Sequence, residues 1–212
     1  EPVLFNIKGA CYADLGQLDV AVTNYKEAIT IKPDYAKAHF NLAGSLHDLG
    51  QLETAVQSYQ KAIEIDASYA EAYNNLGNVF QELKQVDSAV KSYKMALEIK
   101  PDYIAAQYSL GNTFMELGQL EEAVKSYKAT LKLKPDFAGA YNKLGSTLLE
   151  LDQLDESVRS YEAALKHKPD YVEAINNLGI AFYKLQQMDD AMKHYKRALA
   201  LDPDFADAHN NI

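Results

Sequence analysis

Apolar residues return along this chain with the spacing of an α-helix rather than that of a β-strand. One face of the segment 70–83 carries apolar residues three and four positions apart: Ala72, Leu76, Val79, Phe80 and Leu83. The segment 87–99 has the same spacing, and a short polar stretch separates the two. No segment alternates with the two-residue period of a strand. The pattern therefore predicts two amphipathic helices joined by a turn.

The helix pair recurs without insertion every 34 residues. The repeats span residues 2–35, 36–69, 70–103, 104–137, 138–171 and 172–205, and a partial seventh spans 206–212. A tyrosine returns in each full repeat, at Tyr25, Tyr59, Tyr93, Tyr127, Tyr161 and Tyr195. Small residues return at Gly9, Ala43, Gly77, Gly111, Gly145 and Gly179. Because one pair cannot bury its apolar face alone, we expect the repeats to stack into a single domain over residues 1–212.

Glycines mark the expected ends of the first helices. A left-handed residue commonly ends a helix, and three repeats have Gly16, Gly50 and Gly118 at this position. The other three repeats have Lys84, Asp152 and Gln186 there. Each of these replacements should cost about 1 kcal/mol if its backbone is left-handed, because a side chain disfavours that conformation.

Proline-aspartate pairs mark the expected junctions between repeats. A proline closes the second helix at Pro33, Pro101, Pro135, Pro169 and Pro203. The aspartates that follow are the expected N-caps of the next helix: Asp34, Asp102, Asp136, Asp170 and Asp204. The junction after repeat two has Ala67 instead of proline, and Ser68 and Glu71 form the pattern of a capping box there.

These features together resemble the tetratricopeptide repeat family over essentially the whole chain. The arms of O-linked N-acetylglucosamine transferase-like and bacterial transferase-linked proteins are the most similar in character. The resemblance implies an all-α fold, a right-handed superhelical solenoid of antiparallel helix hairpins, whose first helices line a concave groove. The implied inward positions are those of Asn6, Phe40, Asn74, Tyr108, Asn142 and Asn176, and of Ala10, Gly44, Asn78, Asn112, Ser146 and Ile180.

A column of asparagines holds the position of the asparagine ladder of the transferase arm: Asn41, Asn75, Asn177 and Asn211. An asparagine amide can both donate to and accept from a peptide unit. Helices roughly 8–10 Å apart would offer one such amide for about every three residues of an extended peptide. The asparagine column therefore predicts binding of a peptide backbone. The alternative is that these amides tie neighbouring helices together.

Further side chains belong to the expected groove. Asn78 and Asn112 match the asparagine position of a clamp for C-terminal carboxylates in some family members, but the lysines of that clamp are missing. An apolar group is expected in repeats four to six, at Met115, Leu149, Ile180 and Tyr183, with packing against the next repeat as the alternative. An acidic column would attract a basic segment, unless it is only a solvated face: Asp14, Asp48, Glu82, Glu116 and Glu150.

Charge and composition limit the class of partner. The formal net charge of −9 disfavours nucleic acid and anionic membranes as partners, because both bind basic surfaces. No apolar run is long enough to cross a bilayer. The single cysteine, Cys11, cannot form an internal disulfide. We expect a cytoplasmic location.

The sequence predicts a protein-interaction scaffold and not an enzyme. Its five histidines are scattered, and it has no phosphate-binding loop or nucleophile elbow, so we expect no catalytic residue, metal or cofactor. The expected partner is a protein or an extended, basic peptide. The alternative is the substrate-recognition arm of a larger glycosyl- or sulfotransferase whose catalytic domain lies outside this chain. The uncovered face of the last hairpin also predicts end-to-end self-association.

Overall fold

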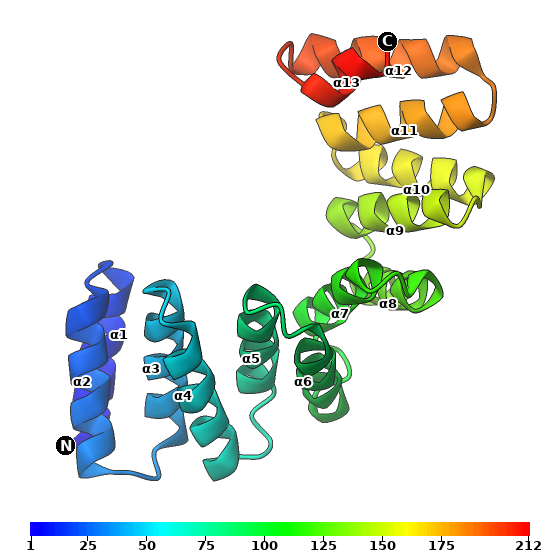
Figure 1. The fold of residues 1–212 in the computed structure, drawn as a ribbon. Coiled ribbons are helices and arrows are strands. Elements are labelled where there is room, and N and C mark those ends of the chain that lie inside the picture. The colour runs from blue at the N-terminus through cyan, green and yellow to red at the C-terminus, as the bar shows by residue number, and fades with distance from the viewer. The chain divides into compact units, whose positions relative to one another are not determined.

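The computed structural model describes residues 1–212, and all its regular elements are helices (Figure 1). Repeats one to three contain α1 (Pro2–Asp14), α2 (Leu18–Ile31), α3 (Ala36–Asp48), α4 (Leu52–Ile65), α5 (Ala70–Glu82) and α6 (Val86–Ile99). Repeats four to six contain α7 (Ile104–Glu116), α8 (Leu120–Leu133), α9 (Ala138–Glu150), α10 (Leu154–His167), α11 (Val172–Lys184) and α12 (Met188–Leu201). The partial seventh repeat contains α13 (Ala206–Asn210). The prediction of two helices in each full repeat is confirmed.

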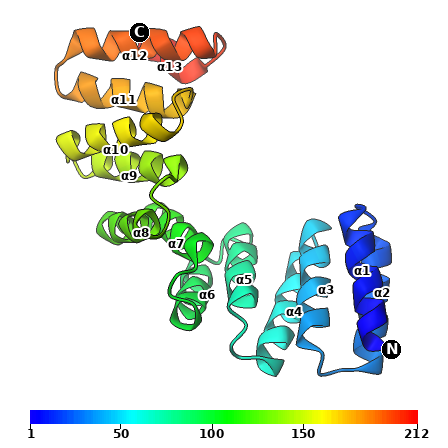
Figure 2. The same cartoon turned by 180° about the vertical axis from the view of Figure 1, so that it is seen from behind.

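The helices pack as consecutive hairpins. Within a repeat the first helix lies against the second, as α1 against α2 and α9 against α10. The second helix also packs against the first helix of the next repeat, as α2 against α3 and α10 against α11. Figures 1 and 2 show this order of helices from two opposite sides. The all-α array of antiparallel hairpins that the 34-residue period predicts is confirmed.

The chain divides into two compact units, Glu1–Ser109 and Leu110–Ile212. The division lies inside α7, between Ser109 and Leu110. The single domain over residues 1–212 therefore stays a prediction. Both units have the same construction, because both are built from the same helix pair.

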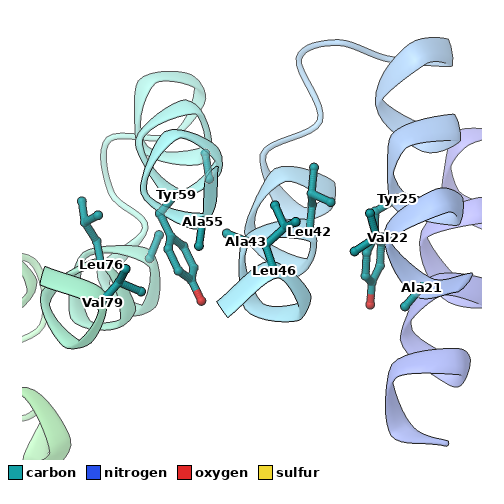
Figure 3. Close-up of a cluster of buried hydrophobic side chains, with 12 residues drawn as sticks. Ala21, Val22, Tyr25, Leu42, Ala43, Leu46, Ala55, Tyr59, Leu76 and Val79 are labelled. Atoms are coloured by element: carbon teal, nitrogen blue, oxygen red, sulfur yellow. The ribbon is translucent and has the colours of Figure 1, made fainter. Parts of the chain in front are cut away.

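The core of the first unit consists of small and branched side chains around buried tyrosines (Figure 3). Tyr25 of α2 and Tyr59 of α4 are almost completely buried. Leu42 and Leu46 of α3 lie in the same cluster, and Val79 of α5 extends it into the third repeat. Each second helix therefore shares its apolar face with two first helices, which is why a repeat needs its neighbours for stability.

The repeated tyrosine fills the space left by the repeated glycine. A Cβ atom built on Gly77 would lie 2.6 Å from Cε1 of Tyr93, and one built on Gly145 would lie 2.7 Å from Cε1 of Tyr161. Real Cβ atoms do not approach a carbon so closely, so the glycine allows the tyrosine ring to contact the backbone of the first helix. The small residue that the sequence repeats in the first helix is thus the partner of the tyrosine in the second.

Gly77→Ala should lower the free energy of unfolding by about 1–3 kcal/mol, because the new methyl group overlaps the Tyr93 ring. Repeat two has Ala43 at this position, so the ring can adjust and the lower end of the range is expected. Gly44→Ala is the matched control, since its Cβ would meet only the Tyr59 hydroxyl, at 3.7 Å. That variant should gain about 0.5–1 kcal/mol from helix propensity. Urea unfolding measures both changes. If the free energy of unfolding changes in the same direction in both variants, the packing argument is contradicted.

Six first helices end in a left-handed residue, as predicted. Gly16, Gly50 and Gly118 have φ values of 72°, 72° and 67°. The non-glycine residues Lys84, Asp152 and Gln186 have φ values of 59°, 58° and 61°. The amide of the following residue then reaches back to the helix, as the N–H of Gln85 does to the carbonyl oxygen of Phe80 at 2.8 Å.

The predicted N-caps are wrong. The N-cap residue is the aromatic residue that follows the aspartate, and its side chain makes no capping hydrogen bond: Tyr35, Phe137, Tyr171 and Phe205. Asp102 likewise lies two positions before the first residue of α7. The capping box is also wrong, because α5 begins after Tyr69, and Ser68 instead donates its N–H and its hydroxyl to the carboxylate of Asp66.

A lysine-aromatic contact holds four of the junctions. The ammonium of Lys32 lies 5.6 Å from the ring centroid of Tyr35, and that of Lys168 lies 4.5 Å from the ring centroid of Tyr171. The same contact recurs between Lys100 and Tyr103 and between Lys134 and Phe137. Such pairs contribute about 0.5–1 kcal/mol at exposed sites. The aromatic residue is fixed by this contact and by its own burial, so the helix can begin without a polar cap.

Candidate functional site

The predicted groove residues all lie on first helices, and most of them are half-buried. The half-buried set is Asn41, Asn75, Asn78, Asn112, Met115, Leu149, Asn177 and Ile180. Tyr183 differs, because 56% of its surface is exposed. A half-buried polar side chain is fixed by its neighbours and still reaches solvent, which is the condition for a binding residue.

In the second unit, α7 and α9 enclose a hollow of about 340 Å³. Its lining consists of Asn112, Met115, Glu116, Lys143 and Glu150. The predicted groove residues Asn112 and Met115 therefore do lie together. The amide and the thioether form part of the wall, and the carboxylates at 116 and 150 bring two members of the acidic column to the same place.

A second hollow, of about 290 Å³, lies between α11 and α13. It is lined by Asn176, Asn177, Ile180, Asp207, Asn210 and Asn211, so the predicted groove residues Asn177 and Ile180 also lie together. Leu149 and Tyr183 line neither hollow. Leu149 instead packs against the core cluster of Tyr161, Leu178 and Ala181, which is the alternative role that the sequence left open for it.

Three members of the asparagine column donate to an asparagine of the preceding repeat. Nδ2 of Asn41 lies 3.0 Å from Oδ1 of Asn6. The same bond joins Asn177 to Asn142 at 3.3 Å and Asn211 to Asn176 at 3.0 Å. The acceptors Asn6, Asn142 and Asn176 are buried, so little of their surface is open to a ligand. They lie between consecutive first helices, where their carbonyl oxygens need a donor.

These bonds leave part of each donor amide unused. An asparagine side chain has two N–H donors and a carbonyl oxygen, and the bond to the preceding repeat uses one donor. Asn41 and Asn177 are half-buried, so one N–H and the carbonyl oxygen remain for a ligand. The tie between helices and the binding of a peptide are therefore compatible roles for one side chain.

Asn75 has a different environment from the rest of the asparagine column. The residue that would accept its N–H is Phe40, which has no polar side-chain atom. Asn75 instead accepts from Nδ2 of Asn74 at 3.1 Å and hydrogen-bonds with the Tyr59 hydroxyl. Oδ1 of Asn74 is left buried without a hydrogen-bond partner. Asn75 is thus held by Asn74 of its own repeat and by Tyr59 of the preceding one, and not by an asparagine of the preceding first helix.

Asn78 and Asn112 are held by tyrosines of the second helix. The hydroxyl of Tyr93 donates to Oδ1 of Asn78 at 2.8 Å, and the hydroxyl of Tyr127 donates to Oδ1 of Asn112 at 2.8 Å. The sequence identified these tyrosines only as residues that return in each repeat. The available signal was the spacing, because the tyrosine and the asparagine are 15 residues apart in both repeats.

The acidic column lies on exposed positions in both units. In the first unit Oε1 of Glu82 lies 2.6 Å from Nε2 of His47, which links α5 to α3. In the second unit Glu116 and Glu150 line the hollow between α7 and α9, with Lys143 beside them. The carboxylates outnumber the lysine there, so this hollow favours a ligand with positive charge.

The histidines serve local structure. His39 and His209 occupy equivalent positions, and their Nε2 atoms lie 2.9 and 2.8 Å from the carbonyl oxygens of Pro33 and Pro203. No group of three or more histidine, cysteine and acidic side chains lies close enough together to hold a metal ion. None of the helices combines the length and the apolar character that a bilayer crossing requires.

Solved structures with the same arrangement are numerous. A structure described as YrrB, a TPR protein with an unusual peptide-binding site, is 25% identical, with a TM-score of 0.78 over 88% of this chain and 96% of that one. PilF of Pseudomonas aeruginosa is 18% identical, with a TM-score of 0.82 over 99% of this chain and 95% of that one. A TPR repeat-containing protein of Cytophaga hutchinsonii is 19% identical, with a TM-score of 0.82 over 100% of this chain and 88% of that one. The last two show the fold alone.

Sequence comparison gives the family. The TPR repeat profile matches residues 9–47, 44–84 and 111–152, which together cover more than half of the chain. Tetratricopeptide repeat profiles also match residues 142–206 and 70–103. No curated protein matches the chain significantly. The helix pairs, their 34-residue period and these matches agree, and the chain belongs to the tetratricopeptide repeat family.

Proposed function

We propose that this chain is a protein-interaction scaffold that binds an extended segment of a partner along its first helices. The observation that carries the proposal is the pair of hollows between consecutive first helices, one lined by Asn112 and Met115 and the other by Asn177 and Ile180. Each hollow combines amide groups, which suit a peptide backbone, with an apolar side chain, which suits a side chain of the peptide.

The character of a related protein supports this proposal. The YrrB structure, which is 25% identical, is described as having a peptide-binding site. The acidic column adds a preference for basic segments, since Glu116 and Glu150 line one of the hollows. The same surface would serve a free scaffold or the substrate-recognition arm of a transferase, so the proposal holds for both settings.

Removal of groove amides should weaken peptide binding. A peptide selected against the chain from a display library is the probe, and the test variant is the double substitution Asn41→Ala, Asn75→Ala. Each lost hydrogen bond should cost about 0.5–1.5 kcal/mol of binding. Asn24→Ala is the control, because Asn24 lies on α2 and bonds the carbonyl oxygen of Val20. Calorimetric titration and a thermal melt are measured for each protein.

The melt separates the two roles of the asparagines. The Asn41→Ala change leaves Oδ1 of Asn6 without its donor, so some loss of stability is expected in any case. If the variant melts earlier but binds the selected peptide as tightly as the parent, the amides are ties between helices and the backbone-binding role is wrong. For a basic peptide, binding should also weaken as salt is raised, and Glu116→Gln with Glu150→Gln should reduce that salt dependence.

We also propose that the chain associates end to end at high concentration. Val3, Leu4 and Ile7 of α1 are about half exposed, and so are Leu201 and Ile212 near the other end. In later repeats the position of Leu4 holds a fully buried alanine, such as Ala38, covered by the preceding repeat. A second copy could cover the α1 face in the same way.

Leu4→Glu with Ile7→Glu should keep the chain monomeric at concentrations where the parent associates, because a carboxylate at a buried interface is costly. Sedimentation equilibrium of both proteins, at protein concentrations up to about millimolar, measures this effect. Val20→Glu is the control, since Val20 is an exposed apolar residue on α2. An identical mass for the parent and the double variant at every concentration would exclude association through this face.

A further inference from the structure

The tyrosine hydroxyls that hold Asn78 and Asn112 also fix which way each amide faces. Tyr93 and Tyr127 are buried, with 1% and 0% of their surfaces exposed. Each hydroxyl donates to the carbonyl oxygen of its asparagine at 2.8 Å. The carbonyl oxygen therefore points toward the second helix. The amide nitrogen, at the opposite corner of the planar group, points away from it.

The exposed side of these two amides is consequently a donor. The nitrogen of an asparagine side chain has two N–H groups and no acceptor. Asn112 lines the hollow between α7 and α9, and its N–H groups are the part of the amide that the tyrosine does not hold. Asn78 is half-buried on α5 and has the same contact with its tyrosine. A ligand group that meets the amide nitrogen of either side chain must accept a hydrogen bond.

The asparagine column displays the other half of the amide. Nδ2 of Asn41 donates to Asn6, and Nδ2 of Asn177 donates to Asn142. Their carbonyl oxygens accept no hydrogen bond that the structure records and stay available beside one remaining N–H. The internal hydrogen bonds thus sort Asn41, Asn177, Asn78 and Asn112 into two kinds, according to which end of the amide they hold.

We propose that Asn78 and Asn112 are donor subsites for backbone carbonyl oxygens of the partner, and that Tyr93 and Tyr127 are their positioning residues. Asn41 and Asn177 serve the peptide N–H groups in the same scheme. This inference rests on the proposed function and names the chemistry of each subsite. Without the hydroxyl, an amide can turn over and present its oxygen to the carbonyl group of the ligand, which repels it.

The chain contains its own comparison for the tyrosine. In repeat five the hydroxyl of Tyr161 meets Oγ of Ser146 at 3.1 Å, so the same buried tyrosine holds no amide there. Tyr161 has 0% of its surface exposed. Removal of its hydroxyl should therefore affect stability much as in Tyr93 and Tyr127, but it should leave the orientation of Asn78 and Asn112 unchanged.

The first experiment uses the protein without a ligand. Side-chain amide NMR should show that both Nδ2 protons of Asn78 and Asn112 exchange freely with water and lie far from the tyrosine ring protons. In Tyr93→Phe and Tyr127→Phe, the side-chain resonances of the neighbouring asparagine should shift, and in Tyr161→Phe they should not. Slow exchange of one Nδ2 proton, with a cross-peak to the tyrosine ring, would mean that the amide faces the other way and would overturn the proposal.

The second experiment measures binding of the display-selected peptide by titration. Tyr93→Phe and Tyr127→Phe together should weaken binding about threefold to tenfold, and Tyr161→Phe should leave it within about twofold of the parent. Asn78→Asp and Asn112→Asp should also weaken binding, because a carboxylate still accepts from the tyrosine but has no N–H to donate. If all three tyrosine changes weaken binding equally, the hydroxyls act only through the stability of the fold, and the proposal is overturned.

The two experiments separate this inference from the proposed function. If no peptide is selected that binds the first-helix face, the proposed function fails and the donor role fails with it, whatever the NMR result. If a peptide binds and Asn41→Ala weakens it but the tyrosine and aspartate variants do not, the groove is confirmed and only the donor subsites are wrong.

Discussion

As the pH rises from below about 10 to well above about 12, the chain should lose about 5 kcal/mol of its folding free energy through two tyrosines alone. Burial raises the pKa of Tyr59 to about 12, and it raises the pKa of Tyr161 to about 12 as well. For each tyrosine, a rise of this size in the pKa corresponds to about 2.7 kcal/mol of stability. The loss is large compared with a typical stability of roughly 5–15 kcal/mol.

The direction follows from which state releases the proton first. In the unfolded chain a tyrosine loses its proton near its ordinary pKa of about 10. In the folded chain Tyr59 and Tyr161 keep theirs until about pH 12. The unfolded state therefore binds fewer protons in this window, and stability falls as the pH rises through it. Below about pH 10 both states are protonated and these two residues add no pH dependence.

Urea unfolding at a series of alkaline pH values measures this loss, and tyrosinate absorbance follows the titration itself. The Tyr161→Phe variant should lose less stability between about pH 10 and about pH 12 than the parent does, because one shifted group is gone. Burial also raises the pKa of Tyr69 to about 12, and it raises the pKa of Tyr25, Tyr103, Tyr171 and Tyr195. The total loss of stability in the parent should therefore exceed that of two groups. A flat stability profile up to about pH 11.5 would contradict the prediction.

Glycine in place of Lys84, Asp152 and Gln186 should raise the free energy of unfolding by about 3 kcal/mol in total. All three residues have left-handed backbones, with φ between 58° and 61°. A side chain there costs about 1 kcal/mol or more relative to glycine, and aspartate tolerates the conformation better than lysine or glutamine does. The three sites lie in different repeats, so their effects should add. The melting temperature should rise by about 6–12 °C.

The neighbouring residue supplies the control for this triple variant. Gln187 follows Gln186 directly and is also exposed, but its φ is −92°. Gln187→Gly should therefore lower stability slightly, because glycine gains freedom in the unfolded chain without relieving strain in the folded one. Differential scanning calorimetry of the parent and both variants gives the comparison. A gain from Gln187→Gly as large as that from Gln186→Gly would show that backbone handedness is not the cause.

The pattern of the sequence was enough to predict the fold, because the relevant signals are local and repeated six times. The spacing of Ala72, Leu76 and Val79 predicts a helix, and Gly16 and Gly50 mark the ends of the equivalent helices in repeats one and two. The N-caps could not be predicted by the usual rule. Asp34 has the right residue type, but Tyr35 packs at the junction and becomes the residue before the helix, so an aromatic contact replaces the polar cap.

The site could be predicted only in part. Two pairs of the predicted groove residues lie together, Asn112 with Met115 in one hollow and Asn177 with Ile180 in another, and their role in binding stays a prediction. The periodicity does not reveal what each side chain bonds inside the fold. The bond of Asn41 to Asn6 and that of Tyr93 to Asn78 depend on how helices meet, and Leu149 is drawn into the core by Tyr161 and Leu178.

The hydrogen bonds between first helices join residues only 35 positions apart in the sequence, as in Asn6 with Asn41 and Asn176 with Asn211. Contacts over such short separations need little loop closure before they form, and chains rich in them fold quickly. Any one hairpin can form first and serve as the surface on which its neighbours fold. A ribosome releases the chain one repeat after another, so each new hairpin emerges next to a partner that is already in place.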